Sequence, residues 1–138
     1  FLMHPGHLAP HPHMVYAELD VPRWIAVLEE LLEGEGSVET VICGIGDVWT
    51  RERALTRLEY IRRLWNSVGS AEAAGMTLGE IQDRCSLDGE FAFVKEYQIY
   101  KDSGDDWVRP QHLTHVKLFF LQLKDELASA LATQRSLV

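Results

Sequence analysis

The chain has 138 residues, of which 46% are hydrophobic and 25% are charged, and its formal net charge is −8. This length allows one hydrophobic core rather than two comfortable domains. The acidic charge opposes binding to nucleic acid or anionic lipid, because both need an excess of Lys and Arg. No apolar run reaches the roughly 20 residues that span a bilayer. The two cysteines, Cys43 and Cys85, lack metal-motif spacing and favour reduced thiols in the cytoplasm.

The N-terminal third of the chain predicts a loop, a helix and a strand. Residues 4–13 contain three prolines and are expected to form a loop. Asp20 can cap a helix near 21–33, where apolar residues recur at helical spacing. Residues 38–43 are rich in β-branched residues and bounded by glycines, which favours a strand. Because a lone strand leaves its edges open, either residues 1–3 pair with it or another chain does.

The rest of the chain predicts mainly helices. Apolar periodicity and capping residues indicate helices near 50–68, 77–86 and 110–133. Residues 87–109 are harder to assign, because their aromatic stretch FAFVKEYQIY fits either an irregular segment or a strand. The order of elements predicts a single domain, residues 1–138, with an α/β fold that contains more helix than strand.

The histidines form two groups that could hold a metal ion. Four lie in the predicted N-terminal loop, and two lie three residues apart at the start of the last predicted helix: His4, His7, His11, His13, His112 and His115. A zinc site needs three or four ligands in tetrahedral geometry. No carboxylate lies within the first group, and no third ligand is obvious for the second. We therefore predict no metal ligand, cofactor or catalytic residue, with zinc as the alternative, and expect surface or partly buried histidines.

Two further groups favour structural roles. A basic cluster spreads around one predicted helix and is expected to form a solvated face: Arg51, Arg53, Arg57, Arg62 and Arg63. The tryptophans are expected to serve core packing or helix docking: Trp24, Trp49, Trp65 and Trp107. A small-molecule pocket lined by Trp49, Tyr60 and Trp107 is a third possibility that the sequence does not separate from core packing.

Several short motifs resemble the C-terminal half of a metallo-β-lactamase-fold hydrolase. The motif C-G-I-G at 43–46 follows the predicted strand, Y-I-R-R-L lies at 60–64, and G-M-T-L-G-E-I lies at 75–81. Residues 111–124 are similar to the terminal helix of that superfamily. The resemblance implies a part of a four-layer αββα sandwich, with few strands and a sheet completed by self-association.

The resemblance also implies that the metal site is incomplete. The superfamily takes its first ligands from an H-x-H-x-D-H motif, which this sequence lacks, and its last from the His of G-H-G, where this chain has Ile45. An aliphatic side chain cannot ligate zinc, so no metal-bound water can be activated there. We expect a non-catalytic, degenerate or truncated relative that acts as a homo-oligomer or with a protein partner. The alternative is a metal-dependent hydrolase with a rebuilt His-based site or a missing N-terminal half.

Overall fold

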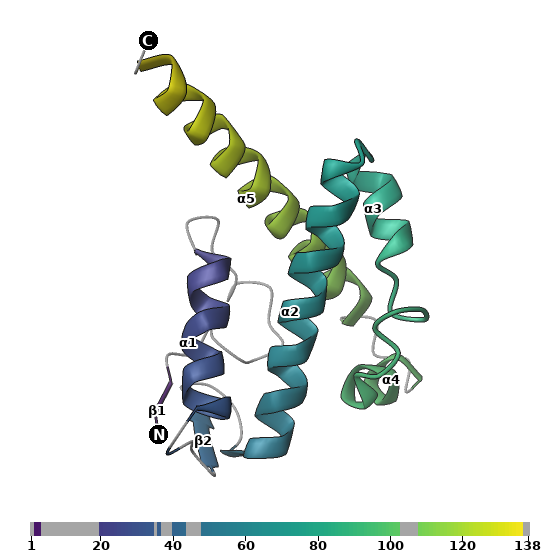
Figure 1. Cartoon of the computed structure of the whole chain (residues 1–138). Helices are drawn as coiled ribbons and strands as arrows, with labels where there is room; N and C mark the ends of the chain where they lie inside the picture. The colour runs from purple at the N-terminus through teal and green to yellow at the C-terminus, as the bar shows by residue number, and fades with distance from the viewer. Residues whose placement is uncertain are drawn as a thin grey trace.

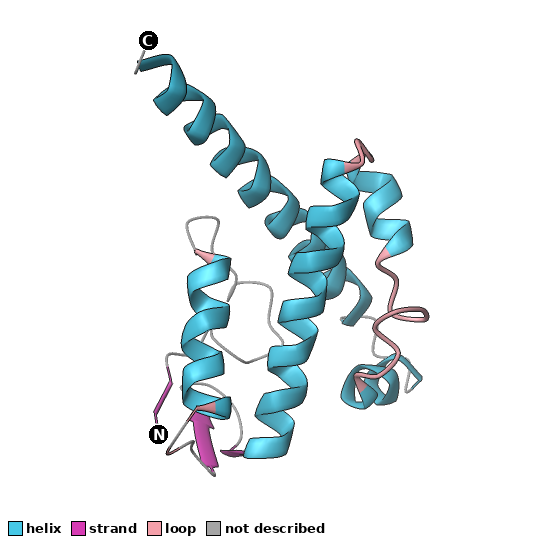
Figure 2. Cartoon of the chain, in the orientation of Figure 1, coloured by secondary structure: helices cyan, strands magenta, loops and turns pink. Residues whose placement is uncertain are grey.

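The computed structural model describes residues 2–3, 20–34, 36, 40–43, 48–102 and 108–136. Figures 1 and 2 show helices with short strands at one end. The helices are α1 (Val21–Glu33), α2 (Arg51–Ala73), α3 (Leu78–Arg84), α4 (Lys95–Asp102) and α5 (Val108–Ser136). The strands are β1 (Leu2–Met3), β2 (Thr40–Cys43) and β3 (Val48–Thr50).

Three helices begin at the residues that the sequence indicates. The side chains of Asp20, Thr50 and Thr77 each accept a hydrogen bond from the backbone N–H three residues later, at 3.1, 3.2 and 3.3 Å. Such a bond satisfies one of the N–H groups that the first turn of a helix leaves without an intrahelical partner. These caps fix where α1, α2 and α3 start.

The strands form one small sheet in the order β1-β2-β3. Strand β2 pairs in parallel with β1, with Leu2 opposite Ile42, and antiparallel with β3, with Val41 opposite Trp49. Of the two alternatives for the central strand, the structure shows pairing within the chain, through Leu2 and Met3. Both sides of β2 are therefore occupied within one chain, and the prediction that self-association completes the sheet is wrong.

The predicted α/β fold with a partial αββα sandwich is also wrong. The helices have 13, 23, 7, 8 and 29 residues, whereas the strands have two, four and three. A sandwich needs two sheets packed face to face, and the described residues contain a single sheet. The stretch FAFVKEYQIY, a possible strand, instead forms a turn and α4. The described chain is a helical fold with a small sheet, so the metallo-β-lactamase-like architecture does not apply to it.

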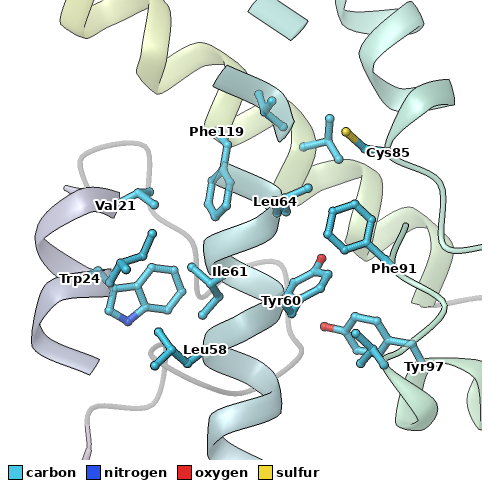
Figure 3. Close-up of a cluster of buried hydrophobic side chains, with 14 of the residues drawn as sticks. Val21, Trp24, Leu58, Tyr60, Ile61, Leu64, Cys85, Phe91, Tyr97 and Phe119 are labelled. Carbon is cyan, nitrogen blue, oxygen red and sulfur yellow. The ribbon is translucent and has the colours of Figure 1, made fainter. Parts of the chain in front are cut away.

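Helix α2 is the centre of the hydrophobic core (Figure 3). On one side, Leu58 and Ile61 face Trp24 of α1, and on the other side Tyr60 faces Phe91 and Tyr97. The Tyr60 ring lies edge-on to those two rings, with centroids 5.6 and 5.3 Å away. Burying a large apolar side chain contributes about 1.5–3 kcal/mol. Because α2 buries such side chains on both sides, it joins the two halves of the core.

Helix α5 packs against α2, α3 and α4 with its N-terminal part. Val116 and Phe119 are buried there, and the Phe119 ring lies 5.7 Å from that of Trp65. Figure 1 shows that the C-terminal part of α5 extends away from the other labelled helices. No helix in the described part of the chain is both long and apolar enough to span a bilayer.

Candidate functional site

His112 and His115 are buried and meet at one phenol. They lie one turn apart in α5 and are only 2% and 5% exposed. The hydroxyl of Tyr60, on α2, lies 2.8 Å from Nδ1 of His112 and 3.2 Å from Nδ1 of His115. The expectation of surface or partly buried histidines is therefore wrong for this pair. Their spacing at i and i+3 puts both rings on the side of α5 that faces α2.

The proton positions in this cluster follow from a single carbonyl. Nε2 of His112 is hydrogen-bonded to the backbone oxygen of Cys85, which can only accept, so Nε2 carries the proton and Nδ1 is an acceptor. The Tyr60 hydroxyl then donates to His112, and Nδ1 of His115 donates to the Tyr60 oxygen. Nε2 of His115 is left as a buried nitrogen without a hydrogen-bond partner among the described residues.

Burial keeps the whole cluster neutral near pH 7. It lowers the pKa of His112, and together with the nearby His112 and Arg57 it lowers the pKa of His115 to about 3. Burial also raises the pKa of Tyr60 well above its usual value, and it raises the pKa of the Cys85 thiol to about 11. None of these groups changes its charge near neutral pH, which suits a structural network better than proton transfer.

The described residues contain no group of three or more His, Cys, Asp or Glu side chains that could hold a metal ion. The zinc alternative at His112 and His115 thus lacks a third ligand in the part of the chain that the structure covers. The remaining candidates lie outside the described residues, and the expectations about them stay predictions: His4, His7, His11, His13 and Ile45. The same holds for Trp107 and for the side chain of Trp49, so the pocket suggested around Tyr60 is not tested.

Arg57 corrects the prediction of a solvated basic face. Its side chain is only 4% exposed and donates from Nη1 to the hydroxyl of Tyr97. Its guanidinium carbon lies 4.7 Å from the Tyr97 ring centroid and 5.8 Å from that of Tyr60. Guanidinium groups stack favourably on aromatic faces, especially away from water. Arg57 therefore extends the buried polar cluster toward α4.

Arg51 and Arg62 of the basic cluster also contact other parts of the protein. Arg51 donates to the carbonyl of Leu32 over 2.5 Å and so ties α2 to the end of α1. Arg62 forms ion pairs with acids of both α1 and α2: Glu29, Glu33 and Glu59. Surface ion pairs of this kind contribute about 0–1 kcal/mol each, so they orient the two helices more than they stabilise them.

A cavity of about 340 Å³ lies beside Arg57. Its lining comes from the start of α2 and from the segment that leads into α4: Thr50, Glu52, Arg53, Thr56, Arg57, Phe93, Val94 and Lys95. A second, more open hollow of about 450 Å³ lies farther along α2, beside Ser67 and Glu90. The cavity beside Arg57 combines a buried cation with the apolar side chains of Phe93 and Val94, so it offers both a polar and an apolar contact to a small ligand.

The sequence contains a signal for the buried position of Arg57. Arg57 lies three residues after Ala54, four before Ile61 and seven before Leu64, all of which are buried. This i, i+3, i+7 spacing places Arg57 on the core-facing side of α2. Arg57 thus differs from the other arginines of the basic cluster in its helical position. The residues of the cavity that follow α3 could not be found in this way, because α4 was not predicted.

No family model, curated protein or solved structure matches this chain. The resemblance to the C-terminal half of a metallo-β-lactamase-fold hydrolase stays a prediction from short motifs, and the fold that it implies is contradicted above. A functional proposal for this chain therefore rests on the geometry of its own residues.

Proposed function

We propose that this chain is a non-catalytic protein that acts by self-association through the C-terminal part of α5. One observation carries the proposal. Leu123 of α5 packs against the core, and the helix continues for more than three turns beyond it, to Ser136. In Figure 1 this continuation lies beside none of the other labelled elements. A neighbour would stabilise this helical end, because most helical stability in proteins comes from tertiary packing of an apolar face.

The sequence of this segment fits an interface. Leu127 and Leu131 follow Leu123 at successive intervals of four residues, so the apolar stripe of α5 continues along the C-terminal part of the helix. Such a stripe gains stability when another apolar helix covers it.

A second copy of the same helix is the occupant that the charges favour. The segment begins with Lys124, Asp125 and Glu126, which have a net charge of one negative unit, and carries Arg135 near its end. Two copies paired antiparallel would therefore bring the acids of one chain near the arginine of the other. Two-fold pairing is also the commonest symmetry of soluble homo-oligomers.

The proposal assigns no catalytic role to the buried histidine cluster. Its described groups are neutral and, apart from Nε2 of His115, hydrogen-bonded within the core. A general acid or base is expected to reach its substrate and to titrate near the working pH. A structural network that fixes α5 on α2 is the simpler role for Tyr60, His112 and His115.

Sedimentation equilibrium at micromolar concentrations tests the proposal. We expect a dimer for the unaltered chain and a monomer for the double variant Leu127→Asp, Leu131→Asp, because two buried carboxylates would oppose pairing. The matched control is Ser129→Asp, Thr133→Asp, which adds the same charge on the opposite side of the helix and should remain dimeric. A monomeric unaltered chain, or equal effects of both double variants, would contradict the proposal.

A further inference from the structure

The cavity beside Arg57 carries an inference that does not depend on self-association. Its walls hold three cationic side chains, Arg53, Arg57 and Lys95, against one carboxylate, Glu52. This local excess of positive charge is opposite in sign to the formal net charge of −8 for the whole chain. Charge of one sign gathered in a hollow with low-dielectric walls concentrates the field on a ligand of the other sign.

Arg57 is held in place before any ligand arrives. Its side chain is 4% exposed, one of its nitrogens donates to the Tyr97 hydroxyl, and its plane lies over the Tyr97 ring. A guanidinium has five N–H donors in a rigid fork, a geometry that suits the paired oxygens of a carboxylate or phosphate. Fixing such a group in advance reduces the entropy that binding costs.

The backbone at the mouth of the cavity has the same polarity. Helix α2 starts directly after Thr50, and α4 starts at Lys95, so two helix N-termini border the hollow. The N-terminal end of a helix carries a partial positive charge and favours anions. The two helix N-termini add to the positive potential of Arg53, Arg57 and Lys95. Without these side chains, the termini alone would not form a site.

The remaining wall is apolar and limits the kind of anion. Phe93 and Val94 contribute to the lining. The Phe93 ring is also held by Arg63, whose guanidinium carbon lies 4.5 Å from the ring centroid. The volume of about 340 Å³ is near the lower end of small-molecule sites. We propose that this cavity binds a small organic anion whose carboxylate or phosphate contacts Arg53, Arg57 and Lys95 while its apolar part packs on Phe93.

Isothermal titration calorimetry with three probes tests the proposal. Benzoate and phenyl phosphate have the charge and the ring that the site requires, whereas benzamide has the ring without the charge. We expect both anions to bind and benzamide to bind at least about tenfold more weakly, because a charged hydrogen bond contributes about 1.5–3 kcal/mol. If benzamide binds as tightly as benzoate, the site does not recognise negative charge and the proposal is wrong. If none of the three probes releases or absorbs heat on binding, the proposed site does not exist.

Variants locate the binding. Lys95→Gln and Arg53→Gln should each weaken benzoate by about tenfold. The control Lys117→Gln removes an exposed cation from α5 that does not line this cavity, and it should leave affinity within a factor of about two. The benzoate affinity of Arg57→Gln is interpreted only if this variant still unfolds cooperatively on heating. If it does not, the affinity of Lys95→Gln still tests the proposal. Equal losses in Lys95→Gln and Lys117→Gln would show nonspecific charge attraction and overturn the proposal.

Discussion

At the scale of single residues, the hydroxyl of Tyr60 is the most consequential atom of the core. It is the described partner of Nδ1 in both His112 and His115, and it joins α2 to α5. A buried polar group without a partner costs about 1–3 kcal/mol. The hydroxyl therefore explains how a hydrophobic core accommodates two imidazoles.

Replacing this hydroxyl should destabilise the protein strongly. Tyr60→Phe keeps the ring but leaves an acceptor on His112 and a donor on His115 unpaired. We expect a loss of about 2–4 kcal/mol in the free energy of unfolding, measured by urea denaturation. Thr114→Ala is the control, since the Thr114 hydroxyl donates to the Pro110 carbonyl at an exposed position of α5. Similar losses in both variants would refute the role of the network.

The same residues predict how stability depends on pH. Burial depresses the pKa of His115 to about 3, so this imidazole stays neutral in the folded chain while that of the unfolded chain binds a proton below about pH 6.5, and burial also lowers the pKa of His112. Because the unfolded state then binds more protons, stability must fall as pH drops from about 6.5 toward 3. Proton binding to His115 in the unfolded state should alone lower the free energy of unfolding by about 2 kcal/mol between pH 7 and pH 5.

Urea denaturation at pH 7, 6 and 5 measures this dependence. The variant His115→Gln removes one titrating group and should reduce the slope between pH 6 and pH 5, whatever its stability at pH 7. Comparing slopes rather than stabilities separates this titration from that of the other histidines. An unchanged slope in His115→Gln would mean that His115 is protonated in the folded chain, contrary to its burial.

At the scale of elements, the sequence predicted helices correctly where capping residues and apolar spacing agree. It failed where a stretch fits more than one kind of element. The bounds of α1 coincide with the predicted 21–33, because Asp20 supplies a cap and the apolar spacing is regular. Helix α4 was missed because the aromatic run before it resembles a strand, although Phe91 and Tyr97 reach the core from a turn and a helix. Strand β3 has only three residues, which is too short for a clear signal in the sequence, and it is defined by its pairing with β2.

The candidate cavity was not predictable for a related reason. Helical spacing could have placed Arg57 on the buried side of α2, but Phe93 and Lys95 join it only through the packing of a segment about forty residues away. Such contacts are decided by tertiary packing rather than by local propensity. The residues on α2 were therefore within reach of sequence analysis, whereas the site as a whole was not.

At the scale of the whole molecule, short motifs proved a poor guide to architecture. The stretches at 43–46, 60–64 and 75–81 fit an αββα sandwich in order and spacing, yet α1, α2 and α5 pack around a helical core. The stretch at 60–64 is part of a helix and that at 75–81 runs from a turn into a helix, features that many folds share, whereas residues 44–46 lie outside the described residues. What the sequence did indicate at this scale is the long apolar face of the last helix, and that face extends beyond the described core.

This extension makes folding and association of α5 depend on each other. If a second copy covers the stripe of Leu123, Leu127 and Leu131, the midpoint of thermal unfolding must rise with protein concentration, because association stabilises only the folded chain. The monomeric variant Leu127→Asp, Leu131→Asp should lose both this dependence and part of its helical circular dichroism at 222 nm, since the end of an isolated helix frays. The control Ser129→Asp, Thr133→Asp should retain both. A midpoint that is independent of concentration in the unaltered chain would show that α5 is stable without a partner, and the association proposal would then lose its physical basis.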